Sequence, residues 1–151
     1  MELCLFEPEI AQNAGTLTRL CACFNITINI IEPASFIIGD KEFKRSGMDY
    51  IKKTQIKLYD SFVDYKLQHT NNRIILLDVK ATNMYYDFRF KYNDCLVVGK
   101  ESTGVPDEVY NQCDSQIKIP MHKNTRSLNV AISAAIVLSE ALRQLDYFTI
   151  K

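Results

Sequence analysis

Short runs of apolar residues recur along this chain and alternate with segments of helical spacing. The runs at 3–6, 26–31, 73–78 and 94–99 are apolar throughout, rather than apolar at every second position. A strand of that composition must be covered on both faces, as the strands of a parallel sheet between helices are. The pattern therefore predicts an α/β fold with a mostly parallel sheet.

Helical patterns fill the intervals between these runs. The stretch 10–24 carries apolar residues along one stripe, and Asn25 is suited to end it. The longest helical pattern covers 126–147. The remaining predicted elements are a helical or loop segment at 40–51, strands at 55–59 and 116–119, and helices at 61–69 and 106–113. We find no repeat or linker, and 151 residues fit one domain over 1–151.

Composition sets the broad class of the protein. The chain has 18 basic and 18 acidic residues and is 47% hydrophobic, which excludes a disordered chain and a nucleic-acid binder driven by net charge. No apolar run reaches the roughly 18 residues of a membrane span. The start at 1–6 lacks the basic region of a signal peptide. We therefore expect a cytoplasmic protein without a membrane segment.

The cysteines and histidines do not follow a metal-site spacing. Five cysteines without a secretory signal fit free thiols in a reducing compartment. The pair Cys21 and Cys23 has the wrong spacing for a zinc ribbon, and the only histidines are His69 and His122. We expect buried thiols and no metal.

Three loops follow predicted strands and carry polar residues. They cover 9–15, 99–106 and 119–129. In open parallel sheets, ligands bind outside the carboxyl ends of the strands. These loops are therefore the candidate ligand-binding segments.

The loop at 99–106 has the glycine spacing of a phosphate-binding loop but not its chemistry. Gly99 and Gly104 are followed by Val105 and Pro106, where that motif requires Lys and Ser or Thr. A nucleoside triphosphate is thereby disfavoured. The glycines allow close approach of the backbone to a ligand, with Glu101 as a nearby acid. A plain turn between a strand and a helix is the alternative.

Basic residues concentrate in two segments. The loop at 119–129 and its flanks have no acid between positions 116 and 139, which suits an anion site at a helix start or, alternatively, a solvated turn. The segment 40–57 has six basic residues against three acids, with Phe43 and Tyr50 between them. Basic residues interleaved with aromatics are typical of RNA-facing surfaces.

The final helix is apolar nearly all round. From Val130 to Leu138 only Ser133 is polar, so no side of this stretch suits water. A second subunit packed on it is the simplest explanation, and a twofold pair is the commonest arrangement.

Together the three loops resemble the motifs of the SPOUT methyltransferases. Within that family they are most similar to the single-domain group that methylates the ribose of tRNA nucleotide 34, a cytidine or modified uridine. The matching stretches are Glu7-Pro8-Glu9-Ile10 with Asn13, Gly15 and Arg19-Leu20-Cys21-Ala22; Ile31-Glu32-Pro33; Asp40-Lys41 with Arg45, Gly47 and Asp49-Tyr50; Gly99, Glu101, Gly104 and Pro106; Ile119-Pro120-Met121 with Arg126-Ser127-Leu128-Asn129; and 140–145.

The resemblance implies an α/β-knot fold with a C-terminal trefoil knot, a homodimer, a tRNA substrate, and S-adenosylmethionine that leaves as S-adenosylhomocysteine. It implies cofactor contacts at Leu77, Gly99, Glu101, Gly104, Ile119, Met121, Ser127 and Leu128. It implies catalytic roles for Arg19, Asn13, Ser127 and Asn129, and RNA contacts at Lys41, Arg45, Lys123 and Arg126. A guanidinium loses its proton very reluctantly, so we expect Arg19 to stabilise charge or clamp a phosphate rather than act as a base.

Several positions depart from the family pattern. Thr103 stands where arginine is common, Ala131 and Ile132 replace a Ser-Asn pair, and Ser139 replaces a tyrosine. These changes remove polar groups at positions that would face the RNA substrate in the family. Two alternatives therefore stay open: a 2′-O-methyltransferase for another tRNA or rRNA position, and a non-catalytic dimer that binds RNA or a small ligand.

Overall fold

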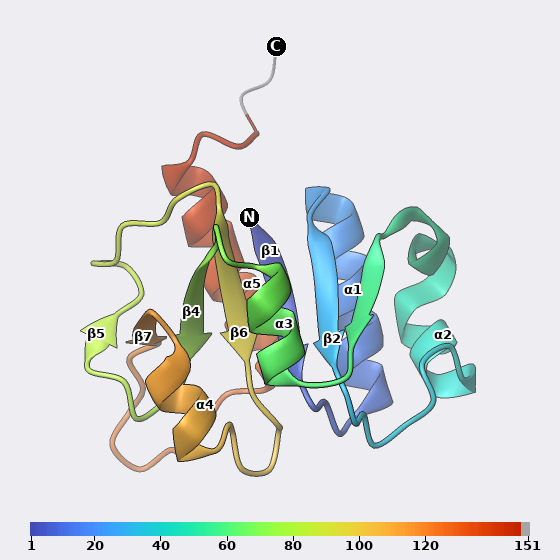
Figure 1. The fold of residues 1–151 in the computed structure, drawn as a ribbon, viewed down its shortest axis with the longest axis horizontal. Helices are drawn as coiled ribbons and strands as arrows, with labels where there is room; N and C mark the ends of the chain where they lie inside the picture. Colours follow the sequence, from blue (N-terminus) through green and yellow to red (C-terminus); the bar gives the residue numbers. More distant parts are fainter. Residues whose placement is uncertain (149–151) are drawn as a thin grey trace.

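The structure is a computed structural model that describes residues 1–148 (Figure 1). Within that range, seven strands form one sheet in the order β3-β2-β1-β6-β4-β7-β5. Every neighbouring pair of strands is parallel, as the uniformly apolar runs predict. The strands are β1 (Glu2–Phe6), β2 (Thr27–Ile31), β3 (Ile56–Tyr59), β4 (Arg73–Leu77), β5 (Asn83–Met84), β6 (Asp94–Val98) and β7 (Ser115–Lys118).

Helices cover both faces of this sheet. They are α1 (Ala11–Phe24), α2 (Lys41–Gly47), α3 (Phe62–Gln68), α4 (Asp107–Gln112) and α5 (Val130–Gln144), with a 3-10 helix, η1, at Met48–Lys53. Residues of α1, α2 and α5 pack in one hydrophobic cluster, and residues of α3 and α4 pack in another. In Figure 1, α3 and α4 accordingly lie in front of the strands, with α1 and α5 behind.

Strand β1 shows why the apolar runs do not alternate with polar residues. Leu3 and Leu5 pack in the cluster of α1 and α5, whereas Cys4 and Phe6 pack in the cluster of α3 and α4. Each face of the strand is therefore buried, and each position requires an apolar side chain. The predicted α/β architecture is confirmed.

The ends of several elements differ from the prediction. The sequence pattern predicts the final helix over 126–147, but the helix begins at Val130 because Asn129 caps it. The Asn129 side-chain oxygen accepts hydrogen bonds from the backbone N–H groups of Ala131 and Ile132. At the other end the helix stops at Gln144. Strand β5 was not predicted, since two residues are too short for a hydrophobic pattern.

The parallel arrangement brings three strand ends to one edge of the sheet. Leu77 at the end of β4 pairs with Val98 of β6 on one side and with Ile117 of β7 on the other. The arrowheads of β4 and β6 point to the lower edge in Figure 1, where the loops before α4 and α5 also lie. The trefoil knot stays a prediction. None of the helices within residues 1–148 is long and apolar enough to cross a membrane.

Candidate active site

A cavity of about 520 Å3 lies at the carboxyl ends of β4, β6 and β7. Its size falls within the range of small-molecule sites in proteins. Segments 77–80, 98–104 and 119–133 contribute most of the wall, and the start of α1 adds Ile10 and Asn13. All eight residues expected to contact a cofactor line this one cavity: Leu77, Gly99, Glu101, Gly104, Ile119, Met121, Ser127 and Leu128.

The loop after β6 is closed by two backbone hydrogen bonds between Lys100 and Gly104, and its two glycines allow this close approach. The backbone N–H groups of Lys100 and Gly104 each donate to the carbonyl oxygen of the other, over 2.9 and 3.0 Å. A Cβ atom on Gly99 would lie 2.5 Å from the carbonyl carbon of Gly104, and Gly104 has a φ of +72°. Both positions therefore require glycine, and a side chain at Gly99 would force this wall of the cavity apart.

Three polar side chains connect the loops across the cavity. Asn13 Nδ2 donates to Glu101 Oε1 over 3.0 Å, and Asn129 Nδ2 donates to Asn13 Oδ1 over 3.0 Å. The second oxygen of Glu101 accepts from the backbone N–H of Glu9 over 2.9 Å. The predicted catalytic residues Asn13 and Asn129 are thus held in one network, in which Asn13 links Asn129 to Glu101.

Glu9 fixes the outer part of the same loop. Its carboxylate accepts hydrogen bonds from the hydroxyl and the backbone N–H of Ser102, each over 2.8 Å. These bonds stabilise the charged form and lower the pKa of Glu9 below its usual value. Lys100 forms an ion pair with Glu7 nearby. The first and second loops are therefore joined at the rim as well as inside the cavity.

Sequence reasoning missed Asp78 as a cavity residue. It follows Leu77 at the end of β4, lines the cavity, and accepts a hydrogen bond from the backbone N–H of Lys80 over 2.8 Å. An acid directly after an apolar strand was the available signal, because ligands bind at the carboxyl ends of parallel strands. Asp78 and Glu101 together give the cavity two carboxylates.

Arg19 is the predicted catalytic residue that does not join this site within one chain. It is exposed, with Nη1 3.3 Å from Met48 Sδ and its guanidinium 5.4 Å from the ring centre of Tyr50. Among the described residues, those that line the cavity do not include Arg19. It lies about 9 Å further along α1 than Asn13 and on a different face of the helix.

The four predicted RNA contacts fall in two places. Arg126 lines the cavity, and Lys123 lies in the same exposed loop. Lys41 and Arg45 are exposed on α2, which packs closely on α1 at Gly15: a Cβ there would lie 2.6 Å from the carbonyl oxygen of Phe43.

Two exposed apolar side chains line the cavity, and a third lies between two lining residues of α5, Val130 and Ser133. Leu128 in the loop before α5 is 40% exposed, Ile132 on α5 is 54% exposed, and Ile10 before α1 is 42% exposed. Leu128 and Ile10 also line the cavity. Exposed apolar side chains that gather around a site are typical of an interaction surface.

Comparison with known proteins places this geometry in a family. Residues 1–139 match the model of the SpoU rRNA methylase family. The chain is 45% identical to the tRNA (cytidine(34)-2′-O)-methyltransferase of Beijerinckia indica over an alignment of 144 residues. This alignment covers 94% of this chain and 90% of the relative.

Solved structures agree with this match. One solved structure concerns the 2-OH methylation of C/U34 on tRNA. It superposes on this chain with a TM-score of 0.91 at 35% sequence identity, and the match covers 96% of this chain and 95% of the solved chain. The SpoU methyltransferase AviRb of Streptomyces viridochromogenes, in complex with AdoMet, has a TM-score of 0.87 at 21% identity and covers 97% of this chain and 60% of its own. The second likeness concerns the fold alone.

Proposed function

Since this chain belongs to the SpoU rRNA methylase family, we propose that it transfers the methyl group of S-adenosylmethionine to the ribose 2′-hydroxyl of tRNA nucleotide 34. The main support for this substrate is the 45% identity, over nearly the whole chain, to a relative named as a tRNA (cytidine(34)-2′-O)-methyltransferase. The cavity supports the cofactor, because all eight expected contact residues line it.

The donor groups of the cavity fit S-adenosylmethionine. Leu77, Ile119 and Leu128 supply an apolar lining for the adenine and the carbon chain. Asp78 and Glu101 supply negative charge for a ligand that carries a positive sulfonium and a positive ammonium. Gly99 and Gly104 keep side chains out of the wall between them.

Bound in this cavity, S-adenosylmethionine would supply an already activated methyl group to a 2′-hydroxyl in an in-line displacement. The methyl–sulfur bond would break, S-adenosylhomocysteine would leave, and the hydroxyl proton would pass to solvent. The principal task of the protein is then to align the hydroxyl with that methyl group. Asn13, Asn129 and Glu101 suit this task, since their hydrogen bonds hold the loops in one arrangement. Ser127, which also lines the cavity, offers a hydroxyl for the substrate side.

We propose that the protein acts as a homodimer and that Arg19 works in the site of the other subunit. Ile10, Leu128 and Ile132 support a subunit contact beside the cavity, because they are exposed apolar side chains, two of which line it. Arg19 stays outside its own cavity. A guanidinium contributed across the contact would stabilise the negative charge that develops on the 2′-oxygen, or hold the adjoining phosphate.

The RNA substrate would extend from the cavity over basic residues. Lys123 and Arg126 suit the nucleotide at the site, and Lys41 and Arg45 suit the tRNA backbone further away. Because the net charge of the chain is zero, we expect tRNA binding to depend on these local patches rather than on general attraction. A tRNA substrate also favours the cytoplasm as the site of action.

The decisive experiment is methyl transfer with labelled S-adenosylmethionine to tRNA that lacks methylation at nucleotide 34, followed by nucleoside mapping. We expect one 2′-O-methylated nucleotide, at position 34. Methylation at another position would replace the proposed substrate with a different RNA site. Failure to bind S-adenosylmethionine in calorimetry would instead indicate a non-catalytic RNA-binding dimer.

A further inference from the structure

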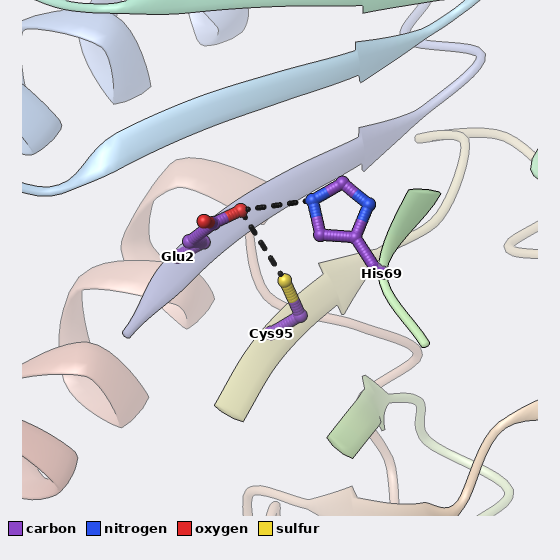
Figure 2. Close-up of side chains that lie close together, drawn as sticks. All are labelled: Glu2, His69 and Cys95. Carbon is purple, nitrogen blue, oxygen red and sulfur yellow. Dashed lines mark hydrogen bonds and ion pairs between the residues drawn. The ribbon is translucent and has the colours of Figure 1, made fainter. Parts of the chain in front are cut away.

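A second cluster of chemically reactive side chains lies at the opposite end of the sheet from the candidate active site. Glu2 begins β1, Cys95 lies beside it on β6 at the same register, and His69 follows α3 (Figure 2). Glu2 Oε2 lies 3.2 Å from His69 Nε2 and 3.6 Å from Cys95 Sγ. Carboxylate, imidazole and thiol therefore meet at one point.

The hydrogen bonds of His69 fix which of its two ring nitrogens carries a proton. Its Nδ1 lies 2.8 Å from the carbonyl oxygen of Tyr65, which can only accept, so Nδ1 carries a proton and donates it. In the neutral ring, Nε2 then directs a lone pair at the carboxylate oxygen of Glu2. Two lone pairs 3.2 Å apart need a positive centre between them, either a proton or a metal ion.

We propose that Glu2, His69 and Cys95 bind one Zn2+ ion. Carboxylate oxygen, imidazole nitrogen and thiolate sulfur are the three ligand types that Zn2+ uses in proteins. Their usual bond lengths place ligand atoms about 3.3–3.8 Å apart in a tetrahedron. The two Glu2 distances, 3.2 and 3.6 Å, are close to that spacing. The third pair, His69 Nε2 and Cys95 Sγ, lies within 4.8 Å and would have to close to about 3.6 Å around the ion.

The residues around the cluster hold each ligand in place. Besides the Nδ1 contact of His69, the Tyr65 hydroxyl lies 2.6 Å from Cys95 Sγ, and Asn29 Nδ2 donates to Glu2 Oε2 over 2.7 Å. Zinc sites depend on such outer hydrogen bonds to orient the ligands and to fix the histidine tautomer. Here all three ligands have such a partner.

The cluster has a path for an ion and a structural consequence. Cys95 is fully buried and His69 is 7% exposed, whereas the Glu2 side chain is 23% exposed, so an ion can enter along Glu2 and keep water as its fourth ligand. Binding of the ion would connect β1 and β6 to the end of α3. We therefore assign the ion a stabilising role, separate from the cavity at the other end of the strands. The sequence alone predicts a protein without metal, and the proposed ion is an alternative to that prediction.

The test uses the full-length protein, reduced and freed of metal with a chelator that is then removed. We expect calorimetry with Zn2+ alone to give one ion per chain, and Zn2+ to raise the unfolding temperature. Co2+ should produce the charge-transfer absorption of a metal–thiolate bond. An unchanged unfolding temperature and no binding at about 0.1 mM Zn2+ would contradict the proposal and leave a shared proton between Glu2 and His69.

Variants locate the ion within the chain. We expect Cys95→Ser and His69→Gln to weaken Zn2+ binding about tenfold or more and to abolish the metal-dependent rise in unfolding temperature. Glu2→Gln is the variant best tolerated by the fold, because Glu2 is partly exposed. Cys113→Ser is the matched control, since it removes a buried thiol outside the cluster and should bind Zn2+ normally. If Cys95→Ser, His69→Gln and Glu2→Gln all bind as the unmodified protein does, the assignment to this cluster is wrong.

Discussion

The two ends of the same parallel sheet carry different kinds of site. At the carboxyl ends, the cavity is formed largely by loops, and the segment 126–129 on its wall is exposed throughout. At the amino ends, Cys95 lies within a strand and His69 directly after a helix, and both are buried. The first end can exchange ligands and meet a large substrate, whereas the second can at most enclose an ion.

This difference follows from how parallel strands are connected. Loops that leave the carboxyl ends can vary in length and composition without disturbing the sheet, so they can provide ligand contacts. At the amino ends, side chains such as Glu2 and Cys95 are fixed by strand register. Changes at the carboxyl ends should therefore alter methyl transfer, and changes at the amino ends should alter stability.

The largest effect on methyl transfer is expected from Arg19. We predict that Arg19→Ala lowers turnover about 100- to 1,000-fold, because in the proposed dimer it removes a positive charge from the reacting oxygen. S-adenosylmethionine affinity should stay nearly unchanged, since Arg19 does not line the cavity of its own chain and its proposed role in the other subunit's site is toward the RNA oxygen or phosphate. Single-turnover kinetics and calorimetry measure the two quantities, with exposed Arg89→Ala as control. Near-normal turnover in Arg19→Lys would rule out a role specific to the guanidinium.

The next effect concerns the glycine turn. In Gly99→Ala the new Cβ would meet the backbone of Gly104 at 2.5 Å. Overpacking costs about 1–3 kcal/mol, so we expect S-adenosylmethionine affinity to fall roughly 10- to 100-fold in calorimetry. Gly39→Ala is the control, because its positive φ makes a side chain unfavourable there as well, but Gly39 lies outside the cavity. Equal affinity in both variants would show that this turn does not shape the cofactor site.

Asn129 combines two roles that a pair of variants can separate. Asn129→Ala removes the cap of α5 and the contact with Asn13, and we expect it to lose about 1 kcal/mol of stability together with part of its turnover. Asn129→Ser keeps a capping oxygen but is too short to reach Asn13. It should regain stability in thermal unfolding while turnover stays low. Full recovery of turnover in Asn129→Ser would mean that only the cap matters.

The smallest effect on turnover is expected at the amino ends of the strands. Arg73 holds the fully buried carboxylate of Asp94 through two hydrogen bonds, of 2.8 and 2.7 Å. Arg73→Ala leaves that charge without its partner and should cost about 3–5 kcal/mol of stability. Turnover of the folded fraction should not change. Arg143→Ala removes an exposed ion pair with Glu140 and should change stability little.

A drop in the turnover of folded Arg73→Ala would contradict the separation between the two ends of the sheet. Thermal unfolding gives the stability, and methyl transfer measured well below the unfolding midpoint gives the turnover of the folded protein.

The sequence by itself determined the α/β class, the parallel sheet and the loops that form the cavity. These features depend on local patterns: apolar runs for strands, Asn25 at the end of α1, and glycines beside Glu101. Only the tertiary structure decided that α5 starts at Val130 and that Asp78 faces the cavity. It alone brought Glu2, His69 and Cys95 together. Strand register and helix packing join residues that are distant in the chain, and no spacing within the sequence records those contacts.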